Sequence, residues 1–149
     1  MISNIQEWFK NQIDTDNNAN DNQHTLELAT AVLLYEVMRA DHKFEQLEQS
    51  SYRKQLENHF SLSGTELESL CQLSQSKADD AADYQQFTRV INDIYGAEEK
   101  RAVLDSLWSV AYADHELSPD EDYTIRKIAD LLYIPHSQFI QSKLSIKPD

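Results

Sequence analysis

Two short acidic segments, one in each half of the chain, contain the residue types that are best suited to chemistry. They are Asp41, His42 and Glu48 in the first segment and Asp114, His115 and Glu121 in the second. Aspartate and glutamate supply the hard oxygen ligands that calcium, magnesium and manganese prefer. An imidazole beside them would extend the choice to zinc. Both segments are therefore candidate sites for a divalent cation.

A purely structural role explains the same residues without a metal. Each aspartate is expected at the C-terminal end of a helix, where its charge costs about 0.3–1 kcal/mol unless something compensates. Hydrogen bonds to loop amides would compensate as a cation would. In the second segment Ser118, Pro119 and Glu121 match a capping box at the start of the next helix. The first segment keeps Glu48 but has Glu45 in the capping position, which favours a further role for the glutamate.

The two segments belong to a longer internal repeat. When Asp41 is aligned with Asp114, the window 34–56 falls on 107–129 without a gap, and eight of the 23 pairs are identical. We interpret the repeat as one helix–loop–helix unit used twice. The first elbow between the helices covers residues 40–48 and the second covers residues 113–121. Neither matches an EF-hand, which needs alternating acidic residues, a central glycine and a longer loop.

The helices that lead into the elbows are expected to be the most buried. Residues 26–40 and 102–113 are apolar on almost every side, which is typical of a helix enclosed by other helices. We expect these two helices to pack on each other at the centre of the domain. Further helices are predicted over residues 46–60, from Ser63, over 84–96 with a left-handed stop at Gly96, from Ser118 to Pro135, and around Phe139, Ile140 and Leu144. The first of these should turn Leu47, Tyr52, Leu56 and Phe60 inward.

These patterns predict an all-α fold, a single multihelical domain with internal duplication around two central buried helices. Only two glycines and three prolines are present, fewer than the turns of a sheet protein require. The helical domain is expected over residues 25–146, with repeats centred on 26–62 and 97–135. Thr25 is suited to cap its first helix.

The residues before this domain fall into two parts. Residues 1–13 are predicted to form an N-terminal amphipathic helix with a stripe of apolar residues. That helix either packs on the domain or docks another protein through Trp8 and Phe9, which are favoured interface anchors. Residues 14–24 form a polar linker rich in Asn and Asp, residues that compete with helix formation.

The bulk composition excludes several classes of function. A net charge of −13 argues against nucleic acid and anionic membranes as partners, because both are bound through Lys and Arg. The single Cys71, at an apolar helical position, allows no internal disulfide and is expected to be a buried thiol. No signal peptide or membrane span is predicted, so we expect a cytoplasmic protein. Without a phosphate-binding loop or a nucleophile–base spacing, we expect no enzyme activity and assign no catalytic residue.

At the elbows the chain resembles the TerB-like family, that is, tellurite-resistance protein B and related domains. The family is marked by two copies of a buried helix that ends in Ala-Asp-Gly, followed by an acidic loop and a glutamate in the next helix. The matching segments here are Ala40-Asp41-His42 with Glu48 and Ala113-Asp114-His115 with Glu121. Histidine replaces the family glycine in both copies. The resemblance covers roughly residues 25–145.

The resemblance implies an all-helical, duplicated and non-enzymatic domain that binds a divalent metal ion and is associated with tellurite and other chemical stress. Carried over by position, the implied metal ligands are Asp41, Glu48, Asp114 and Glu121. Calcium, manganese, magnesium and zinc are the candidate ions, and no organic cofactor is expected. The implied role is that of a sensor or scaffold. The alternative is a protein-interaction module whose acidic elbows only hold the fold, with the N-terminal helix docking a partner.

Overall fold

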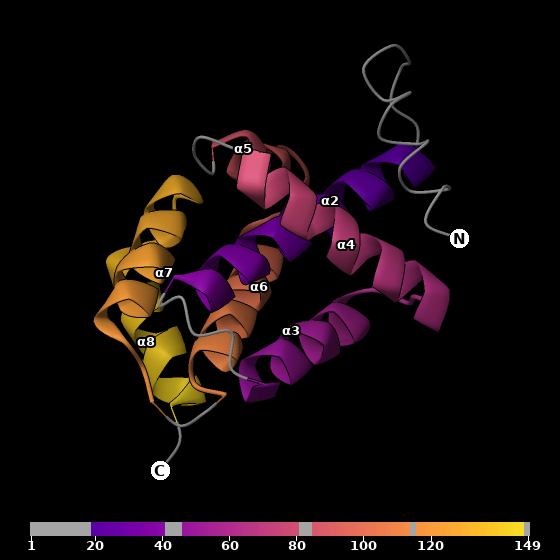
Figure 1. Cartoon of the computed structure of the whole chain (residues 1–149). Helices are drawn as coiled ribbons and strands as arrows, with labels where there is room; N and C mark the ends of the chain where they lie inside the picture. The colour runs from indigo at the N-terminus through magenta and orange to yellow at the C-terminus, as the bar shows by residue number, and fades with distance from the viewer. Residues whose placement is uncertain (1–18, 41–45, 81–84, 114–115, 148–149) are drawn as a thin grey trace.

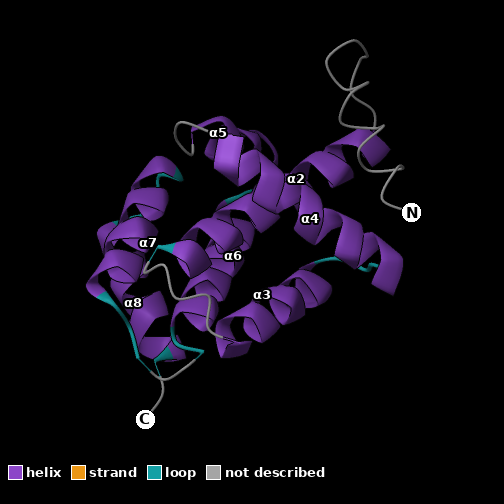
Figure 2. Ribbon diagram, in the orientation of Figure 1, coloured by secondary structure: helices purple, strands orange, loops and turns teal. Residues whose placement is uncertain are grey.

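The computed structural model describes residues 19–40, 46–80, 85–113 and 116–147. These residues form seven α-helices, and no strand occurs among them (Figure 1 and Figure 2). The helices are α2 (Ala19–Arg39), α3 (Gln46–His59), α4 (Gly64–Asp80), α5 (Gln85–Ile94), α6 (Ala97–Ala111), α7 (Pro119–Leu131) and α8 (His136–Ile146). The predicted all-α fold is therefore confirmed. The helix predicted in residues 1–13 lies outside the described residues.

Helices α2 and α6 form the centre of the domain, as their apolar sequences predict. They contact each other, and together they contact every other described helix (Figure 1). Every side chain from Leu26 to Met38 is buried, and so are Leu104, Leu107 and Trp108 of α6. Burying one such large apolar side chain contributes about 1.5–3 kcal/mol. This packing fixes where α2 and α6 end, and so where the two elbows begin.

The surrounding helices are arranged in nearly the same way in the two halves of the domain. Helix α3 packs on α6 as well as on α2, and α7 packs on α2 as well as on α6. Helix α4 packs on α2 as α8 packs on α6. Exchanging α2, α3 and α4 with α6, α7 and α8 thus reproduces these helix contacts. The arrangement agrees with two related units, and the duplication itself stays a prediction from the sequence.

A repeated arginine contacts the third helix of its unit in each half. Arg53 of α3 forms an ion pair with Glu68 of α4, with 2.8 Å between nitrogen and oxygen. Arg126 of α7, which aligns with Arg53 in the repeat, has its guanidinium carbon 5.5 Å from the ring centroid of Phe139 on α8. Both contacts are close to the surface, so each is worth at most about 1 kcal/mol. They orient α4 and α8 rather than hold the fold together.

The start of α2 differs from the sequence expectation. Helix α2 begins at Ala19, so residues 19–24 of the expected linker 14–24 are helical and Thr25 is not a helix cap. The body of α2 is strongly stabilised by burial, and extending it through Asn and Asp costs only about 0.7 kcal/mol per residue or less. Tertiary packing therefore overrides the weak local preference of this stretch. The remaining linker residues lie outside the described part of the chain.

The inward face of α3 was predicted correctly for Tyr52, Leu56 and Phe60 but wrongly for Leu47. Leu47 is 57% exposed, whereas the neighbouring Glu48 is 0% exposed. The buried positions of α3 are Glu48, Tyr52 and Leu56, which are four residues apart and so lie on one helix face. In α8, Phe139 is buried, whereas Ile140 and Leu144 are 36% and 64% exposed.

Two chain reversals use residues other than those expected. Gly96 has an extended backbone (φ −89°, ψ −171°) and precedes the first turn of α6, so it is not the predicted left-handed stop. The left-handed residue is Tyr133 (φ 59°), which follows α7. There the Ile134 N–H donates to the Ala129 carbonyl at 3.0 Å, which closes the helix end. Within the described residues, no helix combines the length and apolar character that a membrane crossing needs.

Candidate functional site

The helices that enter the two elbows end with the same backbone hydrogen bond. The Ala40 N–H donates to the Val37 carbonyl, and the Ala113 N–H donates to the Val110 carbonyl, each with 3.2 Å between nitrogen and oxygen. These bonds span three residues rather than four, so the chain tightens as it leaves each helix. The residues that follow lie outside the described part of the chain. They are Asp41 and His42 in the first elbow and Asp114 and His115 in the second.

Each elbow leads into a completely buried glutamate. Glu48 is the third residue of α3 and Glu121 is the third residue of α7, and both are 0% exposed. Both carboxylate oxygens of Glu48 and the Oε2 atom of Glu121 are shut off from solvent. Burial of an ionised carboxylate costs several kcal/mol unless hydrogen bonds, a cation or a metal ion compensate. Matching burial at equivalent positions of the repeat is the strongest feature of the site.

One oxygen of Glu121 has a defined structural task. Its Oε1 accepts a hydrogen bond from the Ser118 N–H at 3.0 Å, and the Ser118 Oγ accepts one from the Glu121 N–H at 3.1 Å. This is the capping box that the sequence predicts, with Pro119 in the first turn. The box uses only Oε1, so it does not explain why the other carboxylate oxygen is buried.

A second capping box shows that burial is not part of the motif. At the start of α4 the Ser63 N–H donates to Glu66 Oε1 at 2.9 Å, and the Glu66 N–H donates to Ser63 Oγ at 3.1 Å. These distances nearly match those of the Ser118–Glu121 box, yet Glu66 is exposed. Burial of Glu121 is therefore a separate property, set by how α7 packs on the domain.

Polar contacts hold the helices from which the buried glutamates project. The Ser51 hydroxyl of α3 donates to the Ser109 carbonyl of α6 at 3.2 Å, which ties the first half of α3 to the helix that leads into the second elbow. Arg39, the last residue of α2, donates from Nη2 to the Ala78 carbonyl of α4 at 3.1 Å and to Glu36 at 2.7 Å. The ends of both central helices are thus fixed to neighbouring helices.

Burial shifts the pKa of three further groups in the direction that favours their neutral forms. Burial raises the pKa of the Tyr52 phenol, whose hydroxyl is hydrogen-bonded to Ser74, and burial raises the pKa of the Cys71 thiol. Burial lowers the pKa of His59, whose Nε2 lies 2.6 Å from the Ser106 Oγ. Cys71 is free and buried, as the sequence predicts. The Tyr52–Ser74 and His59–Ser106 contacts join residues 22 and 47 positions apart, so the sequence pattern gave no signal for them.

The structure places two of the four expected metal ligands. Glu48 and Glu121 are buried at the starts of their helices, whereas Asp41 and Asp114 lie outside the described residues. Among the residues that are described, no three His, Cys, Asp or Glu side chains are grouped as metal ligands. The donor type fits a hard cation, because each glutamate presents an enclosed carboxylate oxygen and the elbow sequences contain a further carboxylate in Asp41 and Asp114. The four-residue spacing of Glu48 to Tyr52 and Leu56 puts the three on one helix face, but the sequence alone does not show that this face is the buried one.

A pocket of about 320 Å³ lies away from the elbows, between α5 and the C-terminal end of α7. Its lining includes Arg89 and Asn92 of α5 together with Leu131 and Tyr133. Leu131 follows Glu121 by ten residues on the same helix, a distance of about 15 Å along its axis. This pocket therefore does not belong to the buried glutamates and gives no support to a catalytic cleft there.

Comparison with known proteins places both elbows inside one recognised domain. The family model described as tellurite resistance protein TerB matches residues 27–144, which is most of the chain. Searches of curated proteins and of solved structures found no significant match. The family match agrees with the all-helical fold and with the duplicated acidic motif that carried the resemblance. The chain therefore belongs to the TerB family.

Proposed function

We propose that this TerB-family domain binds a divalent cation at one or both elbows and acts as a non-enzymatic sensor or scaffold in a chemical-stress response. The proposed ligands are Asp41 and Glu48 in the first elbow and Asp114 and Glu121 in the second. Calcium, manganese, magnesium and zinc are the candidate ions. The observation that carries the proposal is the complete burial of Glu48 and Glu121 at equivalent places in the two halves.

The burial supports a cation because it exceeds what helix capping requires. Glu66 shows that a capping glutamate keeps its hydrogen bonds while it remains in water. Glu48, in contrast, has both carboxylate oxygens withdrawn from solvent. A cation would neutralise such a carboxylate, with the elbow aspartate, loop carbonyls and water completing the ligand set.

A bound cation would also couple metal concentration to the shape of the domain. Each glutamate belongs to the first turn of a helix, and each elbow aspartate follows the helix before it. A shared ion would join the two helices of one unit, and its binding free energy would add to the stability of the folded state. A domain whose stability changes with metal concentration is the physical basis of the proposed sensor role.

The second candidate is a protein-interaction module whose acidic elbows only hold the fold. The specific observation in its favour is the capping box, in which Glu121 Oε1 bonds to the Ser118 N–H without any metal. In this account the segment 1–13 docks a partner protein. The two candidates differ in what the elbow carboxylates stabilise, and metal-dependent stability separates them.

Thermal unfolding of chelator-treated protein tests the proposal. At an ion concentration 100 times the dissociation constant, binding adds about 2.7 kcal/mol to the stability of the folded state. For a domain of this size that gain raises the melting temperature by about 5–10 °C. We expect such a rise with at least one of Ca²⁺, Mn²⁺, Mg²⁺ and Zn²⁺. The double variant Asp41→Asn/Asp114→Asn should lose the rise.

The interaction-module account predicts a different pattern. There the double variant is less stable than the wild type by the same amount with and without metal, because the aspartates only bond to the loop. An unchanged melting temperature of the wild-type domain with all four ions would refute the cation proposal. Deleting residues 1–13 tests the second part of this account, in which that segment docks a partner protein. A segment that only docks a partner can be removed without unfolding the domain.

A further inference from the structure

Exposed apolar side chains gather on the last helix and its neighbour. Ile140 and Leu144 of α8 are 36% and 64% exposed, and Tyr123 of α7 is 67% exposed. Ile140 and Leu144 are four residues apart, so they share one face of α8 with the exposed Ser137 and Gln141. We call these four residues, together with Tyr123, the α8 face. Single exposed apolar residues are ordinary, whereas a group on one face marks a contact surface.

Side-chain contacts place Tyr123 at the same end of α7 and α8 as Leu144. Lys143 of α8 forms an ion pair with Asp122 of α7 at 2.7 Å, and Arg126 of α7 lies over the Phe139 ring of α8. Residue numbers therefore rise along α7 as they fall along α8, so the two helices run antiparallel. Tyr123 adjoins Asp122, and Leu144 adjoins Lys143, which brings both to the same end of the helix pair. Figure 1 shows α7 and α8 together at one edge of the domain.

The charge of α8 differs from that of the rest of the chain. The protein has 26 acidic residues, but none lies between Leu131 and Lys147. Every other described helix carries at least one Asp or Glu. The Lys143 ammonium is already paired with Asp122 and lies 5.4 Å from the Trp108 ring centroid. The five residues of the α8 face thus include three exposed apolar side chains and no acidic one, on a protein of net charge −13.

The corresponding helix of the first half shows that the fold does not require an apolar face here. Helix α4 packs on α2 as α8 packs on α6. The exposed side of α4 includes the polar residues Glu68 and Gln72, and none of the exposed large apolar side chains of the described residues lies on α4. The exposed apolar side chains of α8 are therefore an addition to the shared architecture.

We propose that the α8 face is a contact surface between two copies of this chain. Two copies of α8 that cross antiparallel on a two-fold axis near Gln141 would bring Ile140 of one copy against Leu144 of the other. Another copy of the chain is the occupant that we favour, because the pairing keeps acidic residues out of the contact. Most other surfaces of two molecules with charge −13 would bring carboxylates together. The inference goes beyond the proposed cation site and does not depend on it.

The size and charge of the surface set the expected strength of the dimer. Helix α8 has 11 residues and is about 16 Å long, so its outer face is smaller than the roughly 800 Å² per partner of a standard interface. We expect a weak dimer with a dissociation constant in the micromolar range. Salt screens the repulsion between the two charged molecules, so the dimer should become tighter as salt is added.

Sedimentation of the full chain over a wide concentration range tests the proposal. We expect a monomer–dimer equilibrium in the wild-type protein that is lost in the variant Ile140→Glu/Leu144→Glu. Both residues are exposed, so the variant should fold normally, which far-ultraviolet circular dichroism would verify. Leu47→Glu is the matched control, because Leu47 is 57% exposed on α3 and should leave the dimer intact. A wild-type chain that stays monomeric, or a dimer that persists in the double variant, would overturn the proposal.

A cross-linking experiment tests the two-fold geometry directly. The single natural Cys71 is buried, so one introduced cysteine can report on contact between copies. Gln141→Cys should form a disulfide-linked dimer on mild oxidation, because the proposed axis passes near this residue. Gln72→Cys, on the exposed side of α4, should remain monomeric. Equal cross-linking of the two variants would show random collision and contradict a specific α8 contact.

Discussion

Glu48 and Glu121 are buried to the same extent, but the fold accounts for them differently. Glu121 uses one oxygen in a capping box with Ser118, and its second oxygen is enclosed by protein. Glu48 has both oxygens enclosed at the start of a helix whose sequence lacks the capping serine. The sequence predicted the Ser118 box from spacing alone. It could not predict burial, because burial depends on the contacts that α3 and α7 make with the two central helices.

A pair of conservative substitutions separates capping from cation binding. Glutamine can replace glutamate in a capping box but is a poorer cation ligand. Without metal, the free energy of unfolding of Glu121→Gln should therefore lie within about 1 kcal/mol of the wild-type value. With metal, the variant should lose part of the rise in melting temperature. Glu66→Gln, in the exposed box of α4, should keep the full rise. The same rise in both variants would assign Glu121 to capping alone.

His59 predicts a pH dependence of stability. Burial lowers its pKa in the folded protein below the ordinary value of 6.5, while the unfolded chain keeps that value. As pH falls below about 6.5 the unfolded state binds the proton first, so the folded state loses stability there. Urea unfolding between about pH 7.5 and pH 5 should show a steeper loss in the wild type than in His59→Gln. Parallel stability curves for the two proteins would show that His59 does not contribute.

The helices differ in how well the sequence predicted them. Helices α2 and α6 are apolar on nearly every side, so their burial and central place follow from composition alone. Helix α3 has few apolar residues, and a rotation by one residue exchanges Leu47 for Glu48 on the inner face. The choice between these rotations is made by contacts with α2 and α6, which no local pattern records. The same holds for the start of α2, where packing of the helix body outweighs the preference of Asn and Asp for turns.

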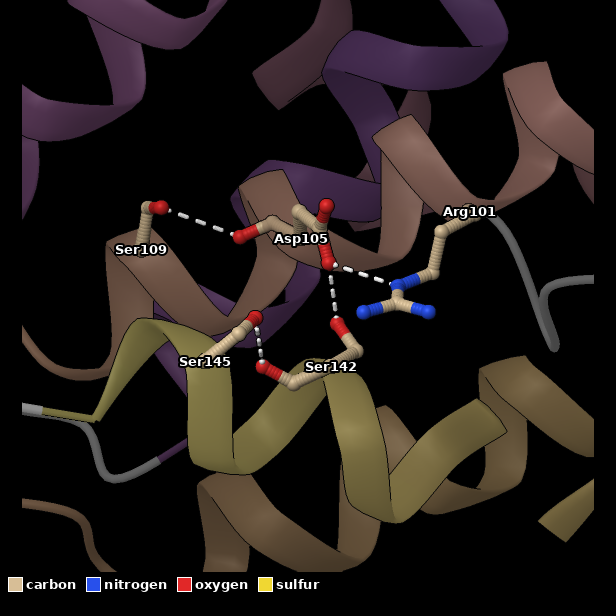
Figure 3. Close-up of polar contacts among 5 residues, drawn as sticks. All are labelled: Arg101, Asp105, Ser109, Ser142 and Ser145. Atoms are coloured by element: carbon tan, nitrogen blue, oxygen red, sulfur yellow. Dashed lines mark hydrogen bonds and ion pairs between the residues drawn. The ribbon is translucent and has the colours of Figure 1, made fainter. Parts of the chain in front are cut away.

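The attachment of α8 to α6 depends on a polar cluster around Asp105 (Figure 3). Asp105 Oδ1 accepts hydrogen bonds from Arg101 Nε at 3.0 Å and from the Ser142 hydroxyl, and the Ser109 hydroxyl donates to the Asp105 carbonyl at 2.9 Å. Ser142 lies on α8 and is 0% exposed, so its hydrogen bond joins α8 to α6 inside the contact between them. The Ser145 hydroxyl instead donates to the Ser142 carbonyl within α8.

Replacing Ser142 and Ser145 in turn tests whether the cluster around Asp105 holds α8 in place. Ser142→Ala removes the bond between the helices and should destabilise the protein by about 1 kcal/mol, because the partly exposed Asp105 keeps Arg101 and gains water. That loss corresponds to a fall in melting temperature of about 2–4 °C. Ser145→Ala removes only a local bond and should leave the melting temperature unchanged. Equal effects of the two substitutions would show that Asp105 does not hold α8.

The whole domain combines a densely packed helical centre with a strongly acidic surface. Its net charge of −13 gives the folded state a self-repulsion that salt or a bound cation would relieve. The sequence predicted the all-α class, the central helix pair and the family from apolar content and a repeated motif. It could not predict that two elbow glutamates are buried or that α8 carries an apolar outer face, because both depend on how helices pack.

Equilibrium dialysis tests most directly whether the elbows bind a cation. Chelator-treated protein would be dialysed against Ca²⁺, Mn²⁺, Mg²⁺ or Zn²⁺ at physiological salt, and the ion bound per chain would be measured by elemental analysis, using protein without a histidine tag. We predict saturable binding of one or two ions per chain by the wild type, in line with the two elbows, and its loss in Asp41→Asn/Asp114→Asn. Absence of bound ion in the wild type, or equal binding by the double variant, would contradict a cation site at the elbows.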